Sequence, residues 1–148
     1  MLFLRLKQSI LNKLTLKFEL DLDFILIALT VPLKDYRLSF KINKQLNIQF
    51  CRQDELYLPA GENSGSYFSM YHYQYKQTET DFYLLANKGT EGFLIPEMKS
   101  ADYFIMIKNF IDDEDLENFL TGLNKIPEVQ VAAEVDPRKL KSKENLIF

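Results

Sequence analysis

Residues 94–107 read Leu-Ile-Pro-Glu-Met-Lys-Ser-Ala-Asp-Tyr-Phe-Ile-Met-Ile, and they join a stiff connector to a long apolar run. Pro96 fixes its own φ and favours an extended conformation at the residue before it. Residues 97–100 are expected to form a turn. Asp102 precedes five apolar residues that begin at Tyr103, a pattern typical of a strand buried on both faces. We therefore expect Asp102 at the entrance of a central strand.

The segment Ile95–Tyr103 reads Ile-Pro-Glu-x-x-x-Ala-Asp-Tyr and resembles the signature of the IPExxxVDY family, a group of small uncharacterised bacterial proteins. Ala101 stands where that family has Val, which removes two methyl groups from a small apolar position. The resemblance extends to residues 34–38, to Asn43 and to the ending at residues 140–148. It implies membership of the family and no particular activity.

Size and composition indicate one globular domain, because the chain has 148 residues, of which 47% are hydrophobic and 14% aromatic. We expect an α+β domain over residues 14–148, preceded by an extension at residues 1–13. This extension is either a short amphipathic helix or dispensable, and it is too short and too weakly charged to hold a membrane surface strongly. The net charge of -3 argues against a nucleic-acid partner.

Cys51 is the only cysteine and His72 the only histidine of the chain. One protomer therefore forms neither a disulfide nor a Cys/His metal cage, which suits a reducing compartment. Near the N-terminus, Arg5 and Lys7 interrupt the apolar stretch, whereas a signal peptide places its charges before an unbroken apolar core. No run reaches the roughly 18 apolar residues of a membrane helix. These features predict a cytoplasmic protein without a membrane partner.

Hydrophobic periodicity predicts the elements of the first third of the chain. Residues 14–22 alternate between apolar and polar, as in a half-buried strand, and residues 24–29 are almost wholly apolar, as in a central strand. Residues 34–47 carry apolar side chains at i+4 steps, which predicts an amphipathic helix that Asn47 can end in a left-handed conformation. Residues 48–51 read as a short strand.

The middle of the chain predicts a loop and then a hairpin. Residues 54–65 read as a mobile loop, because Pro, Gly, Asn and Ser crowd its second half. Residues 67–76 and 80–87 alternate as two strands joined by a three-residue turn. The last third begins with Asp112–Asp115, which cap a helix and offset its dipole. Its buried face carries Leu116, Phe119, Leu120 and Leu123.

A final strand is expected at residues 129–135, followed by a short helix that Asp136-Pro137 begins and Leu140 ends. The order is then strand, helix, strand, hairpin, strand, helix, strand. This rhythm is typical of a split β-α-β arrangement. We predict an enlarged ferredoxin-like α+β fold, with a mainly antiparallel sheet and two long helices on one face.

The signature contains the polar residues most open to a functional reading. Asp35 and Arg37 begin the helix after one central strand, while Asp102 and Tyr103 begin the other central strand. A bidentate contact of Arg37 with Glu97 or with Asp102 would lock the signature to the helix. The group is then either a structural clamp or a notch that binds a ligand or a partner.

A stripe of tyrosines is the second candidate. Tyr67, Tyr71, Tyr73 and Tyr75 are expected on one face of the hairpin. Tyrosines can form a recognition surface, because they bury a large area and keep a polar tip. They can also pair across the hairpin or form a homodimer contact.

Catalytic and metal chemistry find little support in the sequence. His72 lies in mid-strand between tyrosines, and Cys51 is expected to be a small buried hydrophobe. The acids at residues 112–115 lack the alternating ligands and central glycine of a calcium loop. No glycine-rich loop opens a helix after a strand. We expect no cofactor, no metal and no enzymatic activity.

Our leading hypothesis is a non-catalytic domain that acts through protein contacts, as a homodimer. The alternative is a regulatory domain that binds a small molecule near Glu97 and Asp102. The basic tail at residues 138–148 ends in Leu-Ile-Phe. It either docks on the body of the domain or serves as a peptide-like ligand for another protein.

Overall fold

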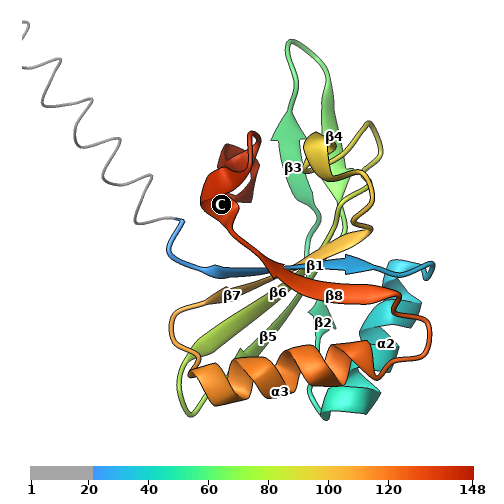
Figure 1. The fold of residues 1–148 in the computed structure, drawn as a ribbon. Helices are drawn as coiled ribbons and strands as arrows, with labels where there is room; N and C mark the ends of the chain where they lie inside the picture. The colour runs from blue at the N-terminus through green and yellow to red at the C-terminus, as the bar shows by residue number, and fades with distance from the viewer. Residues whose placement is uncertain (1–21) are drawn as a thin grey trace, which may run out of the picture.

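The computed structural model describes residues 22–148, and Figure 1 shows a central sheet, helices and a projecting hairpin. The elements are β1 (Ile25–Thr30), α2 (Asp35–Leu46), β2 (Cys51–Arg52), β3 (Leu56–Pro59), β4 (Gly65–Phe68), β5 (Met70–Tyr75), β6 (Thr80–Ala86), the 3₁₀ helix η1 (Pro96–Met98), β7 (Tyr103–Lys108), α3 (Asp113–Asn124), β8 (Val131–Val135), and the 3₁₀ helices η2 (Pro137–Lys139) and η3 (Lys143–Leu146). The predicted α+β class is confirmed. The extension expected at residues 1–13 lies outside the described residues, as does nearly all of the strand expected at residues 14–22.

Six strands form the main sheet in the order β2-β5-β6-β7-β1-β8, and each neighbouring pair is antiparallel. The segments expected as central strands are β1 and β7, which pair with Ile27 opposite Ile105. The hairpin expected from residues 67–76 and 80–87 is β5 and β6, which pair from Met70 to Tyr75. The antiparallel sheet is thus as predicted.

Strand β7 is the centre of the core, because its first five residues are buried. Alternate side chains of the strand enter two apolar clusters on opposite faces of the sheet. Ile105 packs in the cluster that also contains Leu38 of α2 and Leu123 of α3. Phe104 packs in the other cluster, which contains Leu146 near the C-terminal end of the described chain.

The two α-helices have the ends that the sequence predicts. Asn47 follows α2 in the left-handed conformation at φ 55°, and the Asp112 side chain caps α3 by accepting a hydrogen bond from the Asp115 amide at 2.8 Å. Gly122 of α3 lies against Leu46 of α2, where an added Cβ would come within 2.1 Å of a leucine methyl. A glycine there lets the helices approach closely. None of the helices in residues 22–148 is long and apolar enough to cross a membrane.

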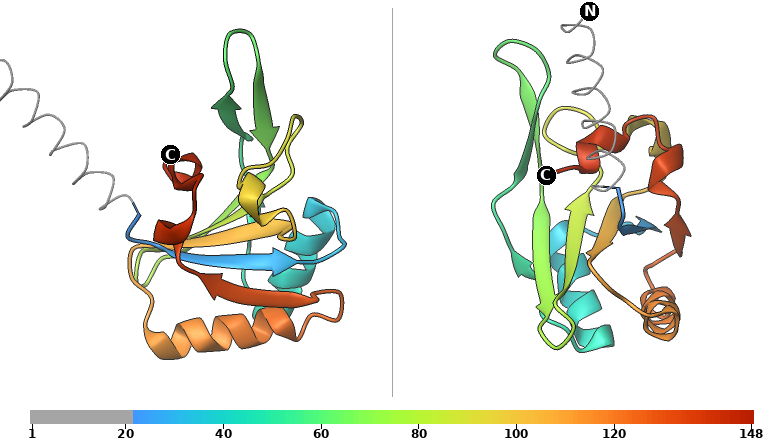
Figure 2. Two further views of the ribbon diagram at one scale, coloured as in Figure 1. Left: turned by 45° about the horizontal axis from the view of Figure 1, so that its top comes forward. Right: turned by 90° about the vertical axis from the view of Figure 1, so that its left-hand side faces the viewer.

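The side of the sheet away from α3 is covered by shorter segments. Figures 1 and 2 show β3 and β4, η1 and the C-terminal segment gathered there. Leu146 is fully buried, and the Phe148 ring lies 5.6 Å from the Tyr83 ring between centroids. Of the two roles considered for the tail, the structure has the docked one.

Three expectations were wrong in detail. The loop expected at residues 54–65 contains β3, which pairs with β4 in a separate hairpin, so only residues 54–55 and the tip at residues 60–64 lie outside strands. A four-residue strand between polar segments gives too short a pattern to recognise. Tyr67 belongs to β4 and so does not share a strand with Tyr71. Cys51 is exposed rather than buried, because it lies on a two-residue edge strand.

Candidate functional site

The signature, residues 95–103, is organised around a side chain outside it. Asn87 follows β6, and its side chain is fully buried. Its amide oxygen accepts a hydrogen bond from the Ile95 amide at 2.8 Å, while its nitrogen donates to the carbonyls of Met98 and Ala101 at 2.9 and 2.8 Å. One asparagine therefore fixes both ends of the η1 turn.

Glu97 connects the signature to the C-terminal segment. Its carboxylate accepts a hydrogen bond from the Ser142 amide at 2.7 Å, and Asn145 in turn donates to the Leu94 carbonyl at 2.8 Å. Burial raises the pKa of Glu97, but hydrogen bonds from its own backbone and from Ser142 hold the pKa below its ordinary value. The ionised side chain thus helps to hold the tail on the sheet.

Asp102 connects the signature to the end of β1. Its carboxylate accepts a hydrogen bond from the Val31 amide at 2.7 Å. Beside it, the Thr30 hydroxyl donates to the Ser100 carbonyl at 2.9 Å. Asp102 lies at the entrance of β7, as the sequence predicts, and there it fixes the chain as it leaves the neighbouring strand.

The structure does not bring Arg37 to the signature. Glu97 and Asp102 both accept hydrogen bonds from backbone amides, and Arg37 lies on α2 near Glu128. Glu128 forms an ion pair with Lys41, and the hydrogen bond from Lys41, together with the charge of Arg37, lowers its pKa. The Arg37 clamp considered from the sequence is therefore absent, because the expected partners already serve the main chain.

Asp35, Tyr71 and Tyr103 come together with a residue that the sequence did not single out, Arg52. The Asp35 carboxylate accepts hydrogen bonds from the Tyr71 hydroxyl at 3.1 Å and from the Arg52 guanidinium at 3.0 Å. The Tyr103 hydroxyl donates to the Leu33 carbonyl at 2.6 Å. These contacts join the start of α2 to β2, β5 and β7.

The pKa shifts in this cluster fit a structural role better than a role in proton transfer. Burial raises the pKa of Asp35, yet hydrogen bonds from Ser69, from the Tyr36 amide and from Tyr71 lower it overall. Burial and then the charge of Asp35 raise the pKa of Tyr71, and the same two causes raise that of Tyr103 further. The carboxylate stays ionised and the phenols stay protonated near pH 7, so none of them is poised as a general base there.

A shallow depression of about 500 Å³ lies beside the signature. Its only carboxylate, that of Asp102, is already bonded to the Val31 amide. The lining residues are Val31, Pro32, Leu33, Lys34, Ala86, Lys88, Asp102 and Tyr103. The depression therefore offers few free polar groups of the signature to a ligand.

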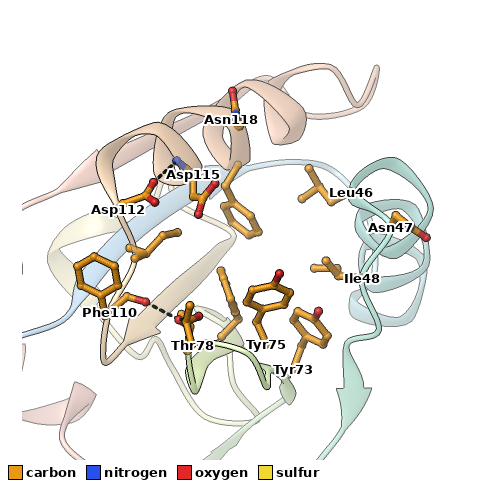
Figure 3. A pocket seen from close by; sticks show the side chains of 14 residues that line it. Leu46, Asn47, Ile48, Tyr73, Tyr75, Thr78, Phe110, Asp112, Asp115 and Asn118 are labelled. Carbon is orange, nitrogen blue, oxygen red and sulfur yellow. Dashed lines mark hydrogen bonds between the residues drawn. The ribbon is translucent and has the colours of Figure 1, made fainter.

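Tyr73 lies elsewhere, in a pocket between the end of α2, the first turns of α3 and the β5–β6 hairpin (Figure 3). The pocket has a volume of about 360 Å³, within the usual range for small-molecule sites. Tyr73 packs across the hairpin on Phe82, with 5.8 Å between ring centroids. The lining residues are Leu46, Asn47, Ile48, Tyr73, Tyr75, Thr78, Thr80, Phe82, Phe110, Ile111, Asp112, Asp115, Asn118 and Phe119.

His72 lies on the other face of the same hairpin. Its Nε2 lies 2.8 Å from an Asp81 oxygen, and its ring lies 4.8 Å from the Tyr83 ring between centroids. Within residues 22–148, no three His, Cys, Asp or Glu side chains are placed to hold a metal ion together. The histidine is thus held by neighbours of its own sheet.

Sequence reasoning missed Asn87, Arg52 and the pocket. A single asparagine or arginine gives no pattern, and the pocket is assembled from four separate segments. In comparisons with known proteins, no family model matches the sequence and no curated protein matches it. The geometry of the structure is therefore the evidence on function.

Proposed function

We propose that the protein is a non-catalytic interaction domain that forms a homodimer through the outer face of α2. The observation that carries the proposal is a pair of large aromatic side chains one helical turn apart, Tyr36 and Phe40, which are 59% and 66% exposed. Single exposed apolar residues are ordinary, but adjacent aromatic residues are typical of contact surfaces.

The placement of these residues suits a second copy of the chain. Phe40 lies near the middle of α2, which runs from Asp35 to Leu46. If two α2 helices cross antiparallel on a two-fold axis at Phe40, Tyr36 of each copy lies opposite Lys44 of the other. That arrangement pairs an ammonium group with an aromatic ring twice. An isologous contact requires such self-complementarity.

Charge on this face does not oppose the contact strongly. Lys41 is paired with Glu128, and Arg37 lies close enough to the same carboxylate to lower its pKa. The single Glu128 carboxylate therefore offsets part of the charge of two of the three basic side chains of the face. Lys44 remains for the Tyr36 ring of the second copy.

Light scattering at increasing protein concentration tests the proposal. The parent protein is expected to be a dimer, and Phe40→Glu is expected to be a monomer, because two carboxylates would meet at the axis. Tyr67→Glu, at an exposed tyrosine of β4, is the matched control and should stay dimeric. A monomeric parent, or equal behaviour of the two variants, contradicts the proposal.

A small-molecule-binding regulatory domain is the second candidate function. The pocket in Figure 3 supports it better than the surroundings of Glu97 and Asp102, whose carboxylates already bind backbone amides. A thermal-shift screen of metabolites tests this candidate, because only a bound ligand raises the unfolding temperature.

We also propose the finer fold type, the family and the location. The order β6-β7-β1-β8, with α2 and α3 as the connections, supports a ferredoxin-like core into which β2 to β5 are inserted. The shared cluster of Leu38 and Leu123 supports helices on one face.

The signature at residues 95–103 supports the IPExxxVDY family. The single, exposed Cys51 supports a cytoplasmic location.

A further inference from the structure

We infer that the pocket between α2, α3 and the β5–β6 hairpin binds an organic ammonium compound, a positively charged nitrogen on a small apolar body. The inference rests on the rings and carboxylates that line the pocket. It stands apart from the homodimer, because neither Tyr36 nor Phe40 lines this pocket.

Aromatic rings form a large part of the pocket wall, five of its 14 lining residues. Adjacent rings are already in contact, since the Phe82 centroid lies 5.8 Å from that of Tyr73 and 5.1 Å from that of Phe119. Ring faces attract cations, and cages of several rings are a recurring way to bind methylated ammonium groups. Five rings line the pocket: those of Tyr73, Tyr75, Phe82, Phe110 and Phe119.

Two of these rings are available to a ligand. Phe110 is 62% exposed and Tyr75 is 41% exposed, whereas Phe82 is buried against the sheet. The Thr80 hydroxyl donates a hydrogen bond to the Phe110 carbonyl, which ties the segment before α3 to the hairpin. The two exposed rings are thus carried by segments that are joined to each other.

The charges at the pocket have one sign. Asp112 and Asp115 line it, and none of the 14 lining residues is Lys, Arg or His. The positive end of the α3 dipole, equivalent to about half a unit charge, lies nearby. The two carboxylates that line the pocket, those of Asp112 and Asp115, outweigh it. A cation is therefore favoured over an anion or a neutral ligand.

The Asp115 carboxylate is the group best placed to meet the ammonium. Asp112 uses one oxygen to cap α3, where it accepts the hydrogen bond of the Asp115 amide. Asp115 has no side-chain hydrogen bond or ion pair with any part of the chain that the structure describes. Figure 3 shows its side chain at the rim of the pocket.

Choline and its neutral carbon isostere, 3,3-dimethylbutan-1-ol, provide a direct test, because they differ in charge and hardly in shape. Each is titrated into the full-length protein while backbone amide signals are followed by NMR. Choline is expected to shift the signals of pocket residues saturably and to bind at least about tenfold more tightly than the alcohol. Equal binding of the two probes, or no saturable shift with choline, overturns the inference.

Matched variants locate the site. Asp115→Asn and Tyr75→Leu are each expected to weaken choline binding by at least about threefold. Asp113→Asn, in the same turn of α3 but outside the pocket, should leave binding unchanged. The changed side chains are exposed, and the amide spectrum shows directly that each variant is folded. An equal loss in Asp113→Asn and Asp115→Asn overturns the assignment to this pocket.

Discussion

Asn87 shows how the signature depends on one buried side chain. It makes three hydrogen bonds to the main chain around η1 and is completely shielded from solvent. A buried amide that satisfies backbone groups on both sides of a turn defines the path of that turn. The signature is rigid for this reason as well as through Pro96.

Replacing Asn87 by Ala is expected to lower the free energy of unfolding by about 3 kcal/mol or more, because buried backbone groups lose their partners. Urea denaturation measures the loss. Asn118→Ala, at an exposed position of α3, should change stability by less than about 0.5 kcal/mol. Equal stability of the two variants would show that the buried amide is dispensable.

Glu97 predicts a specific dependence of stability on pH. Its pKa in the folded protein lies below the ordinary value of 4.5, so its ionised form stabilises the fold. That contribution is fully present above pH 4.5 and is lost as the pH falls through the lower, folded-state pKa. The stability difference between the parent and Glu97→Gln should therefore be largest at neutral pH.

Thermal unfolding at a series of pH values checks this dependence, with the difference between the parent and Glu97→Gln shrinking below pH 4.5. Glu62→Gln, in the exposed loop between β3 and β4, is the control and should match the parent throughout. A difference that grows towards acid pH would reverse the sign and refute the role of the Ser142 contact.

Single residues were the hardest part to predict from sequence. The entrance position of Asp102 follows from the apolar run after it, and that prediction is confirmed. Its partner could not be predicted, because any backbone amide can donate to a carboxylate and side-chain types do not reveal which one does. Arg37 was considered as the partner because its charge is opposite and because it begins the helix after the neighbouring central strand.

At the scale of elements, each of the two helices has near its C-terminal end an asparagine that makes a pair of hydrogen bonds to one later residue. The Asn43 side chain accepts a hydrogen bond from the Phe50 amide at 2.8 Å and donates to the Phe50 carbonyl at 3.2 Å. The Asn124 side chain likewise accepts a hydrogen bond from the Ala132 amide at 3.0 Å and donates to the Ala132 carbonyl at 2.9 Å. Each asparagine thus ties the last turn of a helix to the strand segment that follows it.

Asn124 also protects the edge of the sheet, because β8 is an edge strand and Ala132 lies within it. Asn124→Ala is expected to cost about 1 to 2 kcal/mol and to speed hydrogen exchange at the Ala132 amide. Exchange at Phe50, which Asn43 covers, should not change. If the Ala132 amide exchanges as slowly as in the parent, the side chain does not guard this edge.

Length and pattern explain which elements could be predicted. The strands β1 and β7 and the helices α2 and α3 have long apolar runs or helical spacing, and residues 22–148 contain all of them near the expected places. The hairpin of β3 and β4 was missed, because four-residue strands carry too few positions to show alternation. The capping role of Asp112 was predicted from its place before the helix and is confirmed.

At the scale of the whole molecule, the structural contacts and the candidate binding surfaces lie in different places. On one face of the sheet, η1 and the docked tail are fixed by Asn87, Glu97 and Asn145. The pocket lies between α2, α3 and the β5–β6 hairpin, and Phe40 is exposed on α2. Structural contacts therefore concentrate at the signature, and the candidate binding surfaces involve the helices.

The sequence could not reveal this division. Sheet order and the pocket depend on how distant segments meet, and no periodicity within one segment records that. Composition predicted enough apolar residues for a core, and the described residues bury apolar clusters on both faces of the six-stranded sheet. The location of Tyr73 in a pocket, rather than on a free stripe, follows only from the packing of the helices.

The role of the signature is tested by a double-mutant cycle on Asp102 and Arg37, measured as free energies of unfolding. Asp102→Ala should lose about 1 to 2 kcal/mol, because the Val31 amide loses its acceptor. Arg37→Ala should change stability by less than about 0.5 kcal/mol, and the double mutant should equal the sum of the two. If Asp102→Ala leaves the free energy of unfolding unchanged, or if the two sites are coupled by more than about 1 kcal/mol, the Asp102 carboxylate does not act by binding a backbone amide independently of Arg37.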